Sequence, residues 1–176
     1  NELETAVSAR TGELMAINQK LQDEISDRKS ADSEKLVFLT HYDPVTGLFN
    51  RTHFIDLLSG RLERAGAGAL LLLDIDQFKF ISDSYGHGMG DEFLRRVAKL
   101  LQLNARYLSA KLLKEDKDSV LLSRLSGDEF AVFLPSAGMV EAVEAAEHIR
   151  SALECFYQPD MHCHMTASIG GALFPE

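Results

Sequence analysis

The sequence is short of cysteine, of basic residues and of long apolar runs, and each shortage excludes a class of protein. Its two cysteines, Cys155 and Cys163, are too few for a disulfide framework, which favours a reducing compartment. Lysine and arginine total 18 against 27 acidic residues, and the formal charge of −9 argues against non-specific binding to nucleic acid or to anionic lipid. No apolar run reaches the roughly 18 residues of a membrane span, and no signal-peptide pattern opens the chain.

These features predict a cytoplasmic domain that makes no membrane contact of its own. The chain begins "NELETAV" without an initiator methionine, which we interpret as the sign of a fragment from a longer parent protein. Whether that parent is anchored in a membrane stays open. The 45% apolar residues among 176 suffice for the core of one domain of ordinary size, with chain left over for an appendage.

The appendage is predicted at residues 1–40, which contain neither proline nor a strand-like run and therefore favour one long helix. Its apolar residues follow steps of three and four that are close to a heptad: Leu3, Val7, Leu14, Ile17 and Leu21. Ile25 departs from this repeat, as in a local unwinding of a supercoil. The pattern favours a two-stranded coiled coil that dimerises the chain. An amphipathic helix packed on its own domain is the alternative.

Residues 41–176 alternate between helical and strand-like patterns. The expected elements are a turn-rich junction (41–51), a helix (51–65), a buried strand (69–73), a glycine-rich loop (85–92), a helix (91–108), two strands of a hairpin (120–125 and 130–134), a helix (138–156) and a last strand (161–174). This order predicts an α+β fold, an α/β sandwich with an antiparallel-rich central sheet of four or more strands flanked by helices.

Two pairs of carboxylates stand at the ends of predicted strands. Asp74 and Asp76 follow the buried strand, and Asp128 and Glu129 occupy the hairpin turn of "RLSGDEFAVFLP". If the hairpin lies beside the buried strand, both pairs face one edge of the sheet. Mg²⁺ takes one or two protein carboxylates and leaves its other positions for water and phosphates. The pairs therefore indicate a metal-assisted phosphate site, with ordinary solvated turns as the alternative.

Four motifs occur in an order that resembles the GGDEF family of diguanylate cyclase domains, from about Tyr42 to the end of the chain. They are "DPVTGLFNR", "DIDQFKFISDSYGHGMGDEFL", "RLSGDEF" and "SIGGA". The resemblance implies a fold similar to that of nucleotidyl cyclases and polymerase palm domains. It also implies the joining of two GTP molecules into cyclic di-GMP with Mg²⁺ or Mn²⁺. Because each domain binds one GTP, catalysis is expected to require a homodimer, formed here through the N-terminal helix.

The resemblance also implies a role for individual residues. The implied metal ligands are Asp74, the Ile75 carbonyl and Asp128, and the implied catalytic residues are Asp128, Glu129 and Lys79. The implied substrate-binding residues are Phe78, Lys79, Ser82, His87, Asp91, Arg124 and Gly127. Among these, Glu129 would help to deprotonate the attacking 3′-hydroxyl, Lys79 would hold the triphosphate, and Asp91 would accept hydrogen bonds from guanine. Asp76 would lie near the metals.

The sequence departs from the family pattern in several places. Ser126 replaces the first glycine of the hairpin motif, and Ser82 replaces an asparagine that reads the guanine edge. A single hydroxyl cannot reproduce the paired donor and acceptor of an amide, and losing one such hydrogen bond costs about 1 kcal/mol. "KDSV" at 117–120 replaces an Arg-x-x-Asp product-inhibition site, so inhibition there is not expected. The chain also ends before the final helix of the family, so we expect a truncated domain.

Two further features have simpler interpretations. "MHCHM" offers His162, Cys163 and His164, but strand alternation would turn the cysteine away from the histidines, which argues against a metal site. Cys155 is expected to be a small core residue.

Three functional hypotheses follow. The first is a diguanylate cyclase domain (41–176) that follows a signalling helix (1–40), and this helix transmits the state of a sensor located upstream in the parent protein. The second is a degenerate GGDEF domain that binds GTP and regulates an adjacent EAL-type cyclic di-GMP phosphodiesterase domain. In the third, the helix is the main functional element and the domain is a scaffold for dimerisation.

Overall fold

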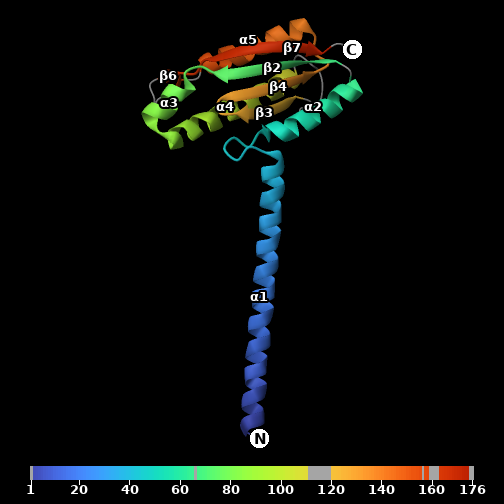
Figure 1. The fold of residues 1–176 in the computed structure, drawn as a ribbon, viewed down its shortest axis with the longest axis vertical. Coiled ribbons are helices and arrows are strands. Elements are labelled where there is room, and N and C mark those ends of the chain that lie inside the picture. The colour runs from blue at the N-terminus through green and yellow to red at the C-terminus, as the bar shows by residue number, and fades with distance from the viewer. Residues whose placement is uncertain (1, 66, 111–119, 156, 159–162, 175–176) are drawn as a thin grey trace. The chain divides into compact units, whose positions relative to one another are not determined.

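The computed structural model describes residues 2–65, 67–110, 120–155, 157–158 and 163–174 (Figure 1). The chain divides into two units, one ending at Thr40 and the other beginning at His41. The first unit lies within helix α1 (Glu2–His41), a single uninterrupted helix as the sequence predicts, whose last residue is counted with the second unit. The exposed apolar side chains of α1 include Leu14, Ile17, Leu21 and Ile25 of the predicted stripe. Among the described residues, no helix combines the length and the apolar character needed to span a bilayer.

The second unit is built around a five-stranded sheet with strand order β1-β3-β4-β2-β7. Its elements are β1 (Phe49–Asn50), α2 (Arg51–Ala65), β2 (Gly68–Ile75), α3 (Phe78–Tyr85), α4 (His87–Leu108), β3 (Leu121–Ser126), β4 (Glu129–Pro135), α5 (Met139–Glu154), β5 (Tyr157–Gln158), β6 (Cys163–His164) and β7 (Ala167–Phe174). β5 and β6 form a separate two-stranded sheet.

The pairing of the strands confirms the predicted antiparallel-rich sheet. β2 runs antiparallel to both of its neighbours, β4 and β7, and β3 and β4 form the predicted hairpin (Figure 1). Among the described strands, the one parallel pair joins the short β1 to β3. β2 therefore lies inside the sheet, with a hydrogen-bonded strand on each side.

The two faces of β2 pack against different clusters, because successive side chains of a strand point to opposite sides. Leu71, Leu73 and Ile75 join the larger core with buried residues of α4 and α5. On the other face, Leu70 packs against a smaller cluster that contains Phe54 of α2. Helices thus cover both faces of the sheet, and the strand that carries the predicted acidic pair is held rigidly between them.

Several boundaries differ from the predictions. The glycine-rich stretch 85–92 is not a loop, because α4 begins at His87 and only Gly86 separates it from α3, an element the sequence patterns had not indicated. The last strand pattern is divided between β6 and β7. Cys155 is exposed at the end of α5, so its assignment to the core was wrong. Phe156 and His162 lie outside the described residues.

Candidate active site at the edge of the central sheet

Four polar residues form a row across neighbouring strands of the central sheet. Ser126 of β3 pairs with Glu129 of β4, Glu129 pairs with Asp74 of β2, and Asp74 pairs with Ser168 of β7. Cross-strand partners have their side chains on the same face, with Cβ atoms roughly 5 Å apart. The register thus brings the buried-strand pair and the hairpin pair of carboxylates to one edge of the sheet, as the sequence predicted.

The hairpin turn is tied directly to the end of β2. The backbone N–H of Ile75 donates to the carbonyl of Asp128, with an N···O distance of 3.3 Å. Gly127 has φ = 45°, a left-handed conformation that favours glycine. A register shift between Arg124 and Ser126 marks a bulge at the end of β3. These features hold the backbone of Asp128 beside the backbone of Ile75, two residues that the resemblance names as metal ligands.

Negative charge accumulates at this edge without a basic partner in the same row. The pKa of Asp74 is raised above its usual value, first by desolvation and then by the charges of Asp128, Glu129 and Asp76. Asp76 is held separately, since the Ser168 hydroxyl donates to its Oδ1 at 2.8 Å. The N–H of Asp76 also donates to the carbonyl of Thr166 at 3.0 Å. A bound cation would relieve the repulsion felt by Asp74.

The oxygen ligands at this edge suit a hard divalent cation. Asp74 directly precedes Ile75, and the charge of Asp128, whose carbonyl accepts from the Ile75 N–H, acts on Asp74. Magnesium accepts such a small set of protein oxygens when water and phosphates complete its shell. Within the described residues, no three His, Cys, Asp or Glu side chains come close enough to bind a metal by themselves. The residues therefore fit a cation shared with a phosphate-bearing substrate.

Helix α3 begins next to this acidic edge. Gln77 links β2 to α3 with φ = 59°, and Phe78 and Lys79 are the first two residues of the helix. The first N–H groups of a helix have no acceptor within it and can bind a phosphate oxygen. Lys79 is exposed, so its ammonium group is accessible to solvent and ligands. Both residues thus stand where a triphosphate held at the edge could reach them.

The residues implied in guanine recognition lie on α3 and α4. The Ser82 hydroxyl is 3.2 Å from Nδ1 of His87, which joins the two helices across Gly86. A Cβ at Gly90 would lie 3.4 Å from Cζ of Phe78 and 3.5 Å from Oγ of Ser82, so the glycine permits a close approach. Asp91 follows on α4 and is partly buried.

Sequence reasoning missed the partner of Arg124. Its Nη1 donates to Oδ1 of Asp43 at 3.1 Å, and its Nε donates to the Gly127 carbonyl at 2.8 Å. Arg124 therefore braces the hairpin turn, while a direct contact with substrate stays a prediction. The Asp-x-x-Thr pattern of Asp43 and Thr46 signals only the local turn, in which the Thr46 N–H and hydroxyl donate to Oδ1 of Asp43, and it does not indicate the distant arginine.

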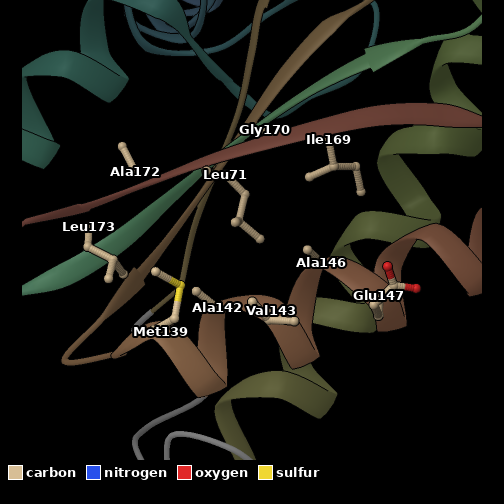
Figure 2. A pocket seen from close by; sticks show the side chains of 11 residues that line it. Leu71, Met139, Ala142, Val143, Ala146, Glu147, Ile169, Gly170, Ala172 and Leu173 are labelled. Atoms are coloured by element: carbon tan, nitrogen blue, oxygen red, sulfur yellow. The ribbon is translucent and has the colours of Figure 1, made fainter.

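Two hollows lie beside β2, and only one contains the acidic edge. A cavity of about 370 Å³ is lined by Asp74, Glu129 and Ser168 together with apolar residues of the sheet. A groove of about 450 Å³ between α5 and β7 is lined mostly by apolar side chains, and Glu147 is its one charged lining residue (Figure 2). Of these two hollows, the first therefore has the lining that suits a cation and phosphates.

An antiparallel-rich sheet with acidic residues at the junction of β2 and the β3–β4 hairpin defines the nucleotidyl cyclase class, whose catalytic fold is the palm. The chain belongs to the GGDEF family, since the family model described as "Diguanylate cyclase, GGDEF domain" matches residues 40–176. Both the family and the fold class predicted from the motifs are confirmed. The "KDSV" departure falls mostly outside the described residues.

Individual relatives agree with this membership. The chain is 38% identical to the response regulator PleD of Caulobacter vibrioides over 112 residues, which cover 61% of this chain and 22% of PleD. It is 36% identical to the diguanylate cyclase DgcM of Escherichia coli over 131 residues, which cover 72% of this chain and 29% of DgcM. The chain thus spans less than a third of the length of either relative.

Among solved structures, the coiled coil and GGDEF domain of DgcB from Caulobacter crescentus, in complex with c-di-GMP, is similar with a TM-score of 0.68. The sequences are 25% identical, and the match covers 89% of this chain and 82% of the DgcB chain.

Proposed function

We propose that this domain condenses two GTP molecules into cyclic di-GMP with release of pyrophosphate. The proposal rests chiefly on one observation: Asp74 and Glu129 face each other as partners on adjacent strands. Asp128 lies next to them, because its carbonyl accepts a hydrogen bond from the Ile75 N–H. This edge stands next to the first turn of α3. An acidic edge beside free helix N–H groups suits a substrate that carries both phosphates and a divalent cation.

The proposed roles follow from this placement. Asp74, Asp128 and the Ile75 carbonyl would hold Mg²⁺ or Mn²⁺, which when bound neutralises charge on the phosphates. Lys79 and the N–H groups at the start of α3 would bind and orient the triphosphate. Glu129 would accept the proton of the 3′-hydroxyl, whose oxygen then forms a bond to the α-phosphorus of the other GTP while the bond to pyrophosphate breaks.

The dimer belongs to the same proposal. One domain holds one GTP, so cyclic di-GMP formation requires two domains to face each other. α1 carries an exposed apolar stripe that a second copy could cover, and the DgcB structure is likewise described as a coiled coil with a GGDEF domain. We propose that a sensor lies upstream and that the domain works in the cytoplasm, where its nucleotide substrate is found.

A regulatory domain that binds GTP without turnover is the second candidate. Ser82 supports this alternative, because its hydroxyl lies within hydrogen-bond distance of His87 and cannot give guanine the paired donor and acceptor of an amide. In that case an adjacent phosphodiesterase domain would be the target of regulation. One relative, MucR of Pseudomonas aeruginosa, is named a bifunctional diguanylate cyclase/cyclic di-GMP phosphodiesterase.

The test is incubation of the full-length protein with GTP and Mg²⁺, followed by chromatography of the nucleotides. We expect cyclic di-GMP from the wild type and none from a variant that combines Asp74→Asn with Asp128→Asn. Asp56→Asn, an exposed aspartate of α2, is the matched control and should retain activity. A dimeric protein that binds GTP but forms no product would favour the regulatory candidate.

A further inference from the structure

Ser126 makes a hydrogen bond that the glycine of the family motif could not make. Its hydroxyl donates to Oε2 of Glu129, with an O···O distance of 2.6 Å. Hydrogen bonds from a hydroxyl to a carboxylate in this distance range are charge-assisted and stronger than neutral ones. The residue that departs from the motif is therefore bonded to the residue proposed to accept the proton.

The bond closes the mouth of the hairpin turn. Ser126 is the last residue of β3 and Glu129 the first of β4, and the two are register partners across the turn. Both side chains are exposed. An exposed glutamate normally samples several rotamers, and fixing it costs conformational entropy. A bond from the facing strand holds this side chain in one arrangement within the folded hairpin.

The held carboxylate faces the rest of the acidic edge. Glu129 pairs with Asp74 on its other side, so it lies between the hydroxyl of Ser126 and the carboxylate of Asp74. Repulsion from Asp74 favours rotamers that turn Glu129 toward β3, and the Ser126 bond fixes the carboxylate on that side. Because the bond uses Oε2, the second oxygen of Glu129 is left out of it.

We propose that Ser126 is a positioning residue that holds the carboxylate of Glu129 for its part in cyclic di-GMP formation. The proposal rests on the proposed function. The proposal assigns to Ser126 a role in orienting Glu129 that the glycine of the family motif cannot have. When a catalytic group is already oriented, a smaller part of the activation free energy goes into orienting it.

The kinetic test compares Ser126→Ala with Ser126→Thr in the full-length protein, with GTP and Mg²⁺ as the probes. Ser126→Ala should lower kcat by about threefold to tenfold and change KM by less than about twofold. The variant loses the hydrogen bond that positions Glu129, the group proposed to accept the proton in the chemical step. Threonine keeps the hydroxyl and suits a strand, so Ser126→Thr should restore kcat. Ser151→Ala, an exposed serine of α5, should leave both constants unchanged. An unchanged kcat in Ser126→Ala would overturn the proposal.

A second measurement separates this proposal from the proposed function. Urea unfolding of Ser126→Ala, Glu129→Ala and the double variant gives a coupling factor without any turnover. We expect a factor of about twofold to fivefold in the unfolding equilibrium constant, as for an exposed charge-assisted bond. A factor of one would overturn the hold of Ser126 on Glu129, whatever the activity. Coupling in a protein that binds GTP but forms no product would overturn the proposed function, and the catalytic role of Ser126 with it.

Discussion

The guanidinium of Arg124 reaches the carboxylate of Asp43 across 81 positions of sequence, with an Nη1···Oδ1 distance of 3.1 Å. Only 12% of the Arg124 side chain and 18% of the Asp43 side chain are exposed. Arg124 also donates to the carbonyl of Gly127 in the hairpin turn. The pair thus connects the segment that follows α1 to the turn that carries Asp128.

Replacing Asp43 should therefore destabilise the domain. Asp43→Asn leaves the Arg124 charge largely buried without its counter-ion, and we expect a loss of about 2 kcal/mol in the free energy of unfolding at pH 7. Urea unfolding followed by circular dichroism measures this change. Glu147→Gln is the control, because its pair with Arg150 is exposed and should contribute less than about 1 kcal/mol. Equal losses in the two variants would contradict the structural role of Asp43.

The same pair predicts a pH dependence. Burial raises the pKa of Asp43, but hydrogen bonds from the side chain and backbone of Thr46, together with Arg124, outweigh it and leave the pKa below its usual value. A carboxylate with a lowered folded pKa contributes stability above its unfolded value, about 3.9, and loses it as the pH falls through the folded pKa. The stability difference between wild type and Asp43→Asn should therefore be full at pH 7 and shrink below about pH 4. Urea titrations at pH 7, 5, 4 and 3 test this trend.

Gly68 at the start of β2 should not tolerate a side chain. A Cβ there would lie 2.7 Å from Cε2 of Phe133 and 2.8 Å from the carbonyl oxygen of Leu134. Because a backbone oxygen in a paired strand cannot move aside cheaply, Gly68→Ala should cost about 2 kcal/mol of stability. Thermal and urea unfolding would measure the loss.

Gly170 provides the matched control for that substitution. It lies in β7, and a Cβ there would meet nothing within 4 Å. Gly170→Ala should change stability by no more than about 0.5 kcal/mol. If both alanine variants were equally destabilised, loss of strand glycine itself and not crowding at Phe133 would be the cause.

The sequence predicted the elements whose period is regular and missed those that depend on long-range packing. The apolar spacing at 51–65 predicted α2 with its observed bounds. The glycines at 86, 88 and 90 suggested a loop, yet only Gly86 has a positive φ, of 85°. Gly90 is instead inside α4, where its missing Cβ lets Phe78 and Ser82 of α3 come close. Such a contact cannot be inferred from composition, because it depends on how two helices meet.

The candidate site shows the same division. Asp74 and Asp128 were predicted because carboxylates at strand ends follow a local pattern, and the register brings their segments together. The bond from Ser126 to Glu129 depends on the bulge at the end of β3, and the bond from Arg124 to Asp43 joins distant segments. Neither a bulge nor a distant partner has a fixed spacing in sequence, so neither bond could be predicted.

Restoring an amide at position 82 should strengthen guanine binding. In Ser82→Asn the side chain regains a paired donor and acceptor, and GTP affinity should rise by about fivefold, while ATP affinity should not change. Isothermal titration calorimetry at fixed Mg²⁺ measures both affinities. Ser84→Asn, on the same helix and exposed, is the control. An equal gain for ATP would mean that position 82 does not read the base.

The apolar stripe of α1 should be the dimer contact. Leu14, Ile17 and Leu21 follow the heptad and are exposed in the single chain, whereas a coiled-coil partner would bury them. Charges at two of these positions would remain unpaired in the seam, so a variant with Leu14→Glu and Leu21→Glu should raise the dimer dissociation constant on the order of a hundredfold. Analytical ultracentrifugation across a concentration series measures the constant.

Met15 supplies the control that separates the stripe from apolar character in general. It is also exposed and apolar, with 67% of its surface accessible, but it does not fall on the three- and four-residue steps that form the stripe. Met15→Glu should therefore leave the dissociation constant within about twofold of wild type, since a solvated position of a coiled coil accepts charge. A dimer that survives the double variant would mean that contacts within residues 41–176 are sufficient, and α1 would then have to transmit a signal without holding the two copies together.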